Sequence, residues 1–308
     1  MSRTGTAVVF PGQGSQFVGM GKDLYESFPR VRELYERANR RLGFDLAGLC
    51  FEGPEEKLNQ TVNTQPAIFV HSVAAWYLLE EKGFAPSVAA GHSRGEYSAL
   101  VAAGFLSFEE GLSLVGLRGA LMQQAGKKAP GTMAAIIGLE DDAVEQLCRQ
   151  AGDTVVPANY NAPGQVVVSG SVAGVAKAME LARQAGARLV KELRVSGAFH
   201  SPLMQYAAAA MKERLDRASI QPGNRPVVPN VTARAETNPE AVRRLLVEQI
   251  TSPVRWSDSM RAIIGSGVIR FVEAGPGSVL SGLCRRIERE ADTTTAGKAE
   301  EIRQFTAS

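Results

Sequence analysis

The pentapeptide Gly91-His92-Ser93-Arg94-Gly95 places a serine at the centre of a G-x-S-x-G pattern. Residues 87–90 before it are typical of a short buried strand, and residues 96–103 after it are typical of a helix rich in small residues. Between such elements the hydroxyl projects from a tight turn beside a helix N-terminus, whose N–H groups favour developing negative charge. The pattern predicts a nucleophilic serine. The structural alternative is a turn whose serine only caps the helix.

A nucleophilic serine needs a base, and the chain contains only His71, His92 and His200. His92 is covalently next to the serine, so the turn directs its side chain elsewhere. His71 lies in the apolar run 67–75, where a lone histidine is more often a core residue. His200 lies in a loop-like stretch after a strand pattern and follows Ser93 in chain order, as bases of hydrolase type do. We therefore favour His200 as the base, the alternative being a surface loop residue.

Arg118 lies in an otherwise apolar helical pattern made by Leu112, Leu114, Val115 and Leu121. An arginine on such a face needs an anionic partner, because a buried and unpaired charge is strongly destabilising. The partner is either a structural glutamate or a substrate carboxylate held by two parallel N–H bonds. Periodicity alone favours the structural salt bridge.

The heptapeptide Phe10-Pro11-Gly12-Gln13-Gly14-Ser15-Gln16 follows the first strand pattern. Its glycines allow the backbone to approach a reacting group closely, so an N–H of this loop and that of Arg94 could together hold an oxyanion. A phosphate-binding loop would have a similar composition, but the lysine of a Walker motif is absent.

Composition argues against several functional classes. A formal net charge of +2 over 308 residues does not indicate a nucleic-acid-binding protein. The 3 cysteines are widely spaced and lack metal-ligand spacing, so we expect reduced thiols and no metal site. The N-terminus lacks a signal-peptide pattern, and no apolar run approaches the roughly 18 residues that a membrane span requires. We expect a cytoplasmic protein without nucleic-acid or membrane partners.

The order of the predicted elements indicates an insertion. Strand-like and helix-like segments alternate over residues 6–125, which predicts an α/β fold with a mainly parallel sheet covered by helices. After a break at residues 126–131, residues 133–195 follow the order strand, helix, strand, strand, helix, strand, which is the ferredoxin-like arrangement. We expect Ser93 and His200 to meet in the cleft between the two units.

In combination, these motifs resemble the malonyl-CoA:acyl carrier protein transacylases of fatty acid synthesis and the related acyltransferase domains of polyketide synthases. The resemblance runs from about Ala7 to Leu283. It rests on the following landmarks, which occur in the order typical of the family: residues 10–16, Thr64-Gln65-Pro66-Ala67, Gly91-His92-Ser93, Gly95-Glu96-Tyr97, Arg118, Asn161-Ala162-Pro163-Gly164-Gln165, Ala198-Phe199-His200-Ser201, Thr251-Ser252-Pro253-Val254-Arg255-Trp256 and Glu273-Ala274-Gly275-Pro276-Gly277.

The resemblance implies a ping-pong reaction. Ser93 would attack the thioester of malonyl-CoA with His200 as base, and the malonyl-serine ester would then pass to the phosphopantetheine thiol of holo acyl carrier protein. The backbone carbonyl of Gln249 would orient the histidine in place of a carboxylate. The backbone N–H groups of Gln13 and Arg94 would form the oxyanion hole.

The resemblance also implies a substrate site and a fold. Arg118 would bind the free malonyl carboxylate, which reverses the preference from periodicity, and Phe199 beside the histidine suits a malonyl group with an unbranched α-carbon. Asn161 and Gln65 would complete the substrate-binding residues. Coenzyme A enters as a thioester substrate, and no bound cofactor is implied.

The family resemblance and the order of the predicted elements together imply a division of the chain into two domains and a tail. Residues 1–128 and 198–290 would form a hydrolase-like catalytic unit, and residues 129–197 an inserted ferredoxin-like small domain. Residues 291–308 contain few apolar side chains, and we expect a loosely ordered tail.

Several alternatives remain open. Freestanding acyltransferases of polyketide synthesis share these motifs, whereas acyl hydrolases that act on carrier-bound thioesters tend to lose the arginine at position 118. A non-catalytic scaffold would not need Ser93, His200 and Arg118 together. Arg94 stands where relatives usually carry an apolar residue, and its side chain could contact a coenzyme A phosphate, disturb Arg118 or pair with an acid.

Overall fold

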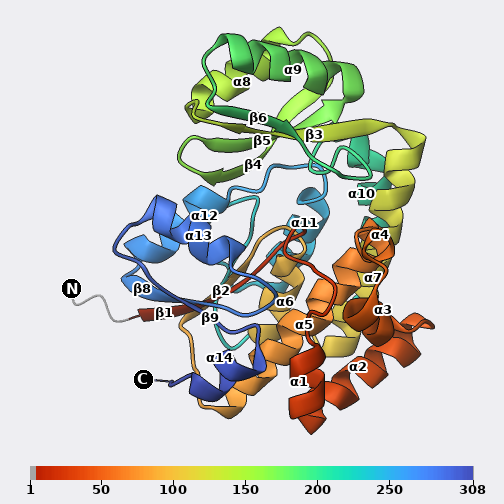
Figure 1. The fold of residues 1–308 in the computed structure, drawn as a ribbon, viewed down its shortest axis with the longest axis vertical. Helices are drawn as coiled ribbons and strands as arrows, with labels where there is room; N and C mark the ends of the chain where they lie inside the picture. The colour runs from red at the N-terminus through yellow and green to blue at the C-terminus, as the bar shows by residue number, and fades with distance from the viewer. Residues whose placement is uncertain (1–4, 308) are drawn as a thin grey trace.

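The computed structural model describes residues 5–307, which form one parallel and one antiparallel sheet (Figure 1). The parallel sheet has the strand order β7-β2-β1-β8-β9. Its strands are β1 (Gly5–Phe10), β2 (Val88–Gly91), β7 (Val227–Val228), β8 (Val268–Glu273) and β9 (Asp292–Thr295). The α/β class with a parallel sheet is therefore confirmed.

The antiparallel sheet has the order β4-β5-β3-β6. Its strands and the two helices between them are β3 (Gly131–Ile137), α8 (Asp141–Gln150), β4 (Val155–Ala162), β5 (Gln165–Ser171), α9 (Val172–Gln184) and β6 (Leu189–Glu192). These are the six elements expected from the sequence, in the expected order. Figure 1 shows α8 and α9 together on the outer face of this sheet, as a separate upper lobe.

The remaining helices surround the parallel sheet. Those that precede the antiparallel sheet are α1 (Lys22–Ser27), α2 (Pro29–Leu42), α3 (Leu46–Glu52), α4 (Glu55–Leu58), α5 (Thr61–Glu81), α6 (Gly95–Ala102) and α7 (Phe108–Lys128). Those that follow it are the short 3₁₀ helix η1 (Pro202–Met204), α10 (Gln205–Leu215), α11 (Pro239–Glu248), α12 (Trp256–Gly265), α13 (Val279–Ile287) and α14 (Ala299–Gln304). None of the helices within residues 5–307 is both long and apolar enough to cross a membrane.

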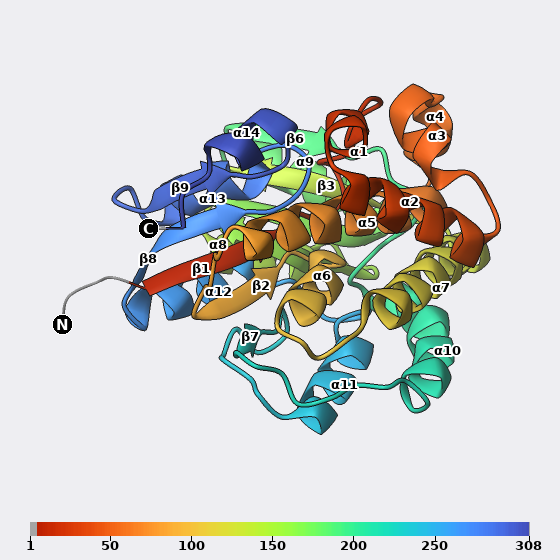
Figure 2. The same cartoon turned by 90° about the horizontal axis from the view of Figure 1, so that it is seen from below.

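The regular alternation expected over residues 6–125 is wrong. That stretch contributes only β1 and β2 to the sheet, and residues 22–81 form successive helices instead. The reason is that an apolar run fits a buried helix as well as a buried strand. Helix α5 is the clearest case, because it is buried on nearly all sides and packs against α2, α6 and α7 in the centre of the molecule (Figure 2).

The parallel sheet is buried on both faces. Along β1, Ala7 and Val9 pack in the cluster that contains Trp256 of α12, whereas Val8 and Phe10 belong to the larger core around α5. Alternate residues of a strand point to opposite faces, so helices on each side bury the continuous apolar run of β1. The carboxyl ends of β1 and β2 therefore lie side by side inside the protein, where the G-x-S-x-G turn begins.

The two sheets are joined by backbone contacts at β4. Val254 donates from its N–H to the carbonyl of Ala158 at 2.8 Å, and its own carbonyl accepts from Tyr160 N–H at 2.9 Å. Val254 lies just before α12, so a segment of the larger unit continues the edge of the antiparallel sheet. This contact fixes the small sheet over the carboxyl edge of the large one.

The segment 291–308 is not the loosely ordered tail that we expected, within the residues that the structure describes. It forms β9 and α14, and the apolar residues of the helix and its end are buried, with Ile302 and Phe305 packed into the main core. The Phe305 ring lies edge-on to Phe84 with centroids 5.2 Å apart. A few apolar residues are enough to pack this segment against the core, because Ala299, Ile302 and Phe305 are spaced three apart and lie on one face.

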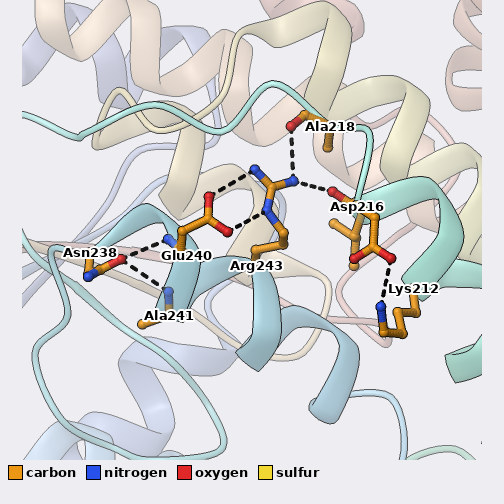
Figure 3. Close-up of polar contacts among 8 residues, drawn as sticks. Lys212, Asp216, Ala218, Asn238, Glu240, Ala241 and Arg243 are labelled. Atoms are coloured by element: carbon orange, nitrogen blue, oxygen red, sulfur yellow. Dashed lines mark hydrogen bonds and ion pairs between the residues drawn. The ribbon is translucent and has the colours of Figure 1, made fainter.

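Helix α11 is tied to the end of α10 by one partly buried arginine. Arg243 donates to the main-chain carbonyls of Leu215 and Ala218, the latter at 3.0 Å, and it also pairs with Glu240 (Figure 3). These carbonyls lie at and beyond the C-terminus of α10, where helix carbonyls lack intrahelical partners. The arginine therefore fixes α11, which ends next to Gln249.

We predict that Arg243→Ala lowers the free energy of unfolding by about 1–3 kcal/mol, because buried carbonyls lose charged donors. Urea unfolding followed by circular dichroism measures this. The matched control is Arg244→Ala, whose side chain is 68% exposed and pairs only with Glu248 one turn away. It should change stability by at most about 0.5 kcal/mol. Equal losses for the two variants would contradict the structural role of Arg243.

Candidate active site

The serine turn is forced by close backbone packing. Ser93 has a φ of 52°, a left-handed conformation that is strained for a residue with a side chain. A Cβ atom on Gly91 would lie 2.0 Å from the carbonyl carbon of Gly95, and one on Gly95 would lie 2.3 Å from the carbonyl oxygen of Phe10. Both glycines of the motif are therefore required by the turn itself, as in a nucleophile elbow.

Asn230 holds the turn from the other side. Its side-chain oxygen accepts from the backbone N–H of Ser93 at 2.7 Å, and its side-chain NH₂ donates to the carbonyl of Gly91 at 2.7 Å. The residue is fully buried, just beyond β7. One amide thus satisfies two backbone groups that the strained turn leaves without partners inside the sheet.

His200 lies beside the serine, as the sequence predicted. Its Nε2 is 2.7 Å from the Ser93 Oγ, and its Nδ1 is 2.8 Å from the carbonyl oxygen of Gln249 and 3.2 Å from that of Ser252. Carbonyl oxygens only accept, so Nδ1 carries the hydrogen and Nε2 is free to accept from the serine hydroxyl. The Gln249 carbonyl thus contacts Nδ1, and its orienting role, which the resemblance implies, stays a prediction.

The electrostatic surroundings keep His200 neutral. Burial lowers the pKa of its imidazole to about 3, and the nearby positive charge of Arg118 acts in the same direction. The two carbonyl contacts oppose this shift but do not overcome it. A neutral imidazole with a free Nε2 is the form that can take a proton from a hydroxyl.

Arg118 of α7 points at the serine from inside the protein. It is 1% exposed, its Nη2 lies 3.2 Å from the Ser93 Oγ, and it donates to the side-chain oxygens of Gln65 at 2.8 Å and Gln249 at 3.0 Å. Within residues 5–307 it forms no ion pair, so the structural salt bridge favoured by periodicity is absent. Burial lowers the pKa of this guanidinium, and Tyr97 faces it with the ring centroid 5.9 Å from Cζ.

Gln249 serves the site through both its backbone and its side chain. While its carbonyl binds His200, its side-chain NH₂ donates to the Ser93 carbonyl at 3.0 Å and to the Glu96 carboxylate at 2.8 Å. Glu96 is 2% exposed, and burial raises its pKa to about 7 although two hydrogen bonds favour its charged form. The side-chain amide of Gln249 therefore lies between Arg118 and Glu96 and hydrogen-bonds to both.

A cavity of about 110 Å³ opens onto these groups. Its lining residues are Gln13, Gln65, His92, Ser93, Arg94, Arg118, Met122, Met133, Asn159, Leu193, Val195, Phe199 and His200. Met133, Leu193 and Val195 belong to β3 and to the segment after β6, so the small sheet closes one side of the cavity. The cavity therefore lies between the antiparallel sheet and the serine turn, and both Ser93 and His200 line it.

Most of the substrate residues expected from the resemblance lie in this cavity. Gln65 and Phe199 line it beside Arg118. Asn161 is not among its lining residues, and its side-chain oxygen is instead 2.8 Å from the Nε2 of His92. Asn159, two residues earlier on the same strand, lines the cavity in its place.

The two backbone donors expected for an oxyanion lie at the same wall. Gln13 is in the loop after β1, and Arg94 is the N-cap residue of α6. Among the described residues, neither backbone N–H donates a hydrogen bond to another protein group. The pair is thus available to a negatively charged oxygen near Ser93.

The side chain of Arg94 lies inside the protein. It is 1% exposed, so it does not reach a coenzyme A phosphate at the surface, and within residues 5–307 it forms no ion pair. Burial, together with repulsion from Arg118, holds the pKa of its guanidinium well below its usual range. Contact with a coenzyme A phosphate and pairing with an acid are therefore excluded for the Arg94 side chain. Of the three alternatives, only an electrostatic disturbance of Arg118 agrees with the structure.

His71 is a core residue, as expected. It is 1% exposed in α5 and donates from Nε2 to the carbonyl of Gly297 at 2.8 Å. Cys50, Cys148 and Cys284 are free and buried. Within the described part of the chain, no cluster of histidine, cysteine and acidic residues is arranged to hold a metal ion.

Sequence reasoning missed Asn230 and the carboxylate of Glu96 as parts of the site. Glu96 occurs in one of the family landmarks, so its position carried a signal that was not used. Asn230 lies in a segment without a recognisable pattern, more than a hundred residues after the turn that it holds. No local feature of the sequence indicates that contact.

Two buried imidazoles, of His71 and His200, and the partly buried one of His92 give a testable pH dependence. Burial lowers the pKa to about 4 for His71, about 4 for His92 and about 3 for His200. The unfolded chain protonates these residues near pH 6.5, so between about 4 and 6.5 it binds more protons and the free energy of unfolding falls on acidification. Glu96 acts in the opposite direction. Because its pKa is raised to about 7, the folded protein binds a proton there before the unfolded chain does, which offsets the loss of stability from one of the three histidines.

We predict that the three imidazole signals in the proton NMR spectrum of the folded protein stay constant between about pH 8 and pH 5.5. Stability measured by urea unfolding should decrease over the lower part of this range. A histidine of the folded protein that titrates near 6.5 would contradict the buried, neutral arrangement.

Comparison with known proteins agrees with this geometry. Residues 7–303 match the family model described as acyl transferase domain. The malonyl CoA-acyl carrier protein transacylase of Bacillus subtilis (strain 168) is 44% identical over 299 residues, which cover 96% of this chain and 94% of the relative.

Solved structures give the same result. The acyl carrier protein S-malonyltransferase of Vibrio cholerae O1 biovar eltor str. N16961 superposes with a TM-score of 0.94 at 42% identity, covering 97% of this chain and 99% of that one. A malonyl-transacylase solved in complex with its holo type II PKS acyl-carrier protein has a TM-score of 0.94 and 42% identity, with coverage of 97% and 98%. The chain therefore belongs to the malonyl CoA-acyl carrier protein transacylase family of acyltransferases.

Proposed function

We propose that this chain transfers a malonyl group from malonyl-CoA to the phosphopantetheine thiol of holo acyl carrier protein, through an ester on Ser93. The observation that carries the proposal is the position of Arg118, whose Nη2 lies 3.2 Å from the serine Oγ at the wall of a small buried cavity. This guanidinium lacks a carboxylate partner within residues 5–307. The free carboxylate of a serine-bound malonyl group would supply one. The names of the relatives support the same reaction.

In the first half-reaction, the Ser93 Oγ attacks the thioester carbonyl while His200 Nε2 accepts the hydroxyl proton. The tetrahedral intermediate collapses by breaking the carbon–sulfur bond. The imidazolium gives its proton to the departing sulfur, so coenzyme A leaves as a thiol and the serine carries the malonyl ester. The carbonyls of Gln249 and Ser252 accept from Nδ1–H throughout and stabilise the imidazolium.

In the second half-reaction, the pantetheine thiol of the carrier attacks the ester carbonyl. His200 accepts the thiol proton and returns it to the Ser93 oxygen as the ester bond breaks. The products are malonyl-carrier thioester and free serine. One imidazole thus acts as base and then as acid in each half, which requires that it be neutral when the thioester binds.

The oxyanion of both intermediates would be held by the backbone N–H groups of Gln13 and Arg94. Both donors are free of other protein partners in the described structure, and Arg94 opens the helix α6. Each such donor contributes about 3 kcal/mol to transition-state stabilisation in related acyl transfer reactions. The hole therefore acts on any thioester, whereas selection among thioesters belongs to the cavity.

Selection for malonyl would come from the cavity and its cation. Arg118 would exchange a hydrogen bond to a neutral oxygen for an ion-paired contact with the malonyl carboxylate. Gln65 holds the guanidinium from α5, and Phe199 limits the space beside the nucleophile. A cavity of about 110 Å³ suits a short acyl group.

The carrier and the architecture complete the proposal. The neighbour solved with its type II PKS acyl-carrier protein supports a carrier of either fatty acid or polyketide synthesis as acceptor. Residues 129–197 would be the ferredoxin-like insertion, supported by the order β4-β5-β3-β6, in a hydrolase-like unit formed by residues 1–128 and 198–290. Malonyl-CoA is a substrate in this scheme, and no resident cofactor takes part.

The experiment follows the acyl group by intact-protein mass spectrometry. Malonyl-CoA alone should add one malonyl group to the protein, and subsequent holo acyl carrier protein should remove it with formation of malonyl-carrier. Ser93→Ala should abolish the adduct. Ser98→Ala is the matched control, because Ser98 is also buried in α6 and should leave the adduct intact. His200→Ala should slow both halves by roughly 10²–10⁴-fold.

An adduct that persists on Ser93→Ala would contradict the nucleophile. Release of free malonate without a carrier would indicate the hydrolase alternative. If His200→Ala impaired acylation but left transfer untouched, the scheme with one shared base would be wrong.

A further inference from the structure

Arg94 has a buried guanidinium that the proposed reaction does not use. The residue follows the nucleophile directly, and its side chain is 1% exposed at the wall of the active-site cavity. Its Nη2 donates to the carbonyl oxygen of Pro11 at 2.6 Å. Its Nε and Nη1 are buried without a hydrogen-bond partner in the described structure.

The carbonyl that Arg94 holds belongs to the loop that carries the other proposed oxyanion donor. Pro11 follows the last residue of β1, and Gln13 is two residues further along. The loop lies tightly on the serine turn, because a Cβ atom on Gly12 would be only 2.8 Å from the Nδ1 of His92. At 2.6 Å the contact from Arg94 is a short, charge-assisted bond, of the stronger class in proteins.

We propose that Arg94 is a positioning residue that fixes the distance between the two donors of the oxyanion hole. Its backbone N–H is one donor, and its side chain holds the loop that presents the N–H of Gln13. This inference rests on the proposed acyl transfer. Productive sites hold their groups to within about 0.5 Å, so a loop released at Pro11 would weaken the stabilisation of the oxyanion.

The arrangement carries a cost in stability. Two of the three guanidinium nitrogens lack partners, and the charge of Arg118 repels that of Arg94. A buried charge with so little compensation destabilises a fold, so an apolar residue of similar size should be tolerated at this position. The inference therefore predicts that an apolar substitution at Arg94 lowers activity while stability stays equal or rises. A purely structural role predicts that both decrease.

The test is Arg94→Met, which keeps the length of the side chain and removes the donors and the charge. Acylation of Ser93 by malonyl-CoA and by acetyl-CoA should both slow by roughly ten- to a hundred-fold, since the hole serves either thioester and a complete donor contributes about 10²–10³. KM should change little, and Tm should stay equal or rise. Arg94→Lys keeps one donor and should recover part of the rate.

Arg225→Met is the matched control. Arg225 also has a buried nitrogen without a partner, and it stacks on Trp76 at 5.1 Å, outside the catalytic cavity. Its substitution should leave both acylation rates unchanged.

Several outcomes would overturn the inference. An unchanged kcat in Arg94→Met would make the guanidinium dispensable. A loss of rate confined to malonyl-CoA would make it a substrate contact. A variant that fails to fold would make it a structural support. A wild-type protein that forms no adduct with either thioester contradicts the proposed function, and this inference falls with it. An active wild type with an unaffected Arg94→Met overturns this inference alone.

Discussion

A guanidinium that is buried beside the Ser93 hydroxyl and, within residues 5–307, hydrogen-bonded only to uncharged side chains is the constraint on which the rest of the site depends. Arg118 is held by the side-chain oxygens of Gln65 and Gln249, and its charge contributes to the low pKa of His200. Neutral amides can fix the guanidinium without neutralising it, so its charge remains available to a ligand. Burial is the larger cause of the low pKa of His200, and the charge of Arg118 adds to it by disfavouring protonation of the imidazole. The proposed selection of a malonyl carboxylate and the neutral state of His200 would thus both depend in part on Arg118.

The fold brings these groups together from distant segments. The serine turn lies at the carboxyl edge of the parallel sheet, which is the usual place for sites in open α/β sheets. His200 lies there because the chain leaves the antiparallel sheet and returns directly to the turn. Gly126 of α7 packs against the backbone of this returning segment at Ser196 and Gly197. Helix α11, anchored by Arg243, delivers Gln249 to both the base and the guanidinium. The backbone strain at Ser93 is maintained by the close packing of Gly91 and Gly95 and by the hydrogen bonds of Asn230.

The sequence predicted the chemistry better than the architecture around it. Ser93 follows from a local pattern, whereas His200 follows from the scarcity of histidines in the whole chain and from its order after Ser93. The role of Gln249 came only from the family resemblance, since a backbone carbonyl leaves no mark in residue type. The contact of Asn230 with the turn depends on tertiary packing, which no local pattern encodes. For the same reason, the buried helices of residues 22–81 were mistaken for alternating strands and helices.

The most direct measurement of the central claim is the ratio of kcat/KM for malonyl-CoA to that for acetyl-CoA in Arg118→Ala and Arg118→Lys. A charge-assisted, bidentate contact contributes about 1.5–3 kcal/mol, so alanine should lower the ratio by roughly one to two powers of ten. Lysine should recover only part of it, because it keeps the charge without the planar fork. Tm should not fall, since a buried charge without an acidic partner is removed. Equal losses for both thioesters, accompanied by a lower Tm, would contradict the account and make Arg118 a structural residue.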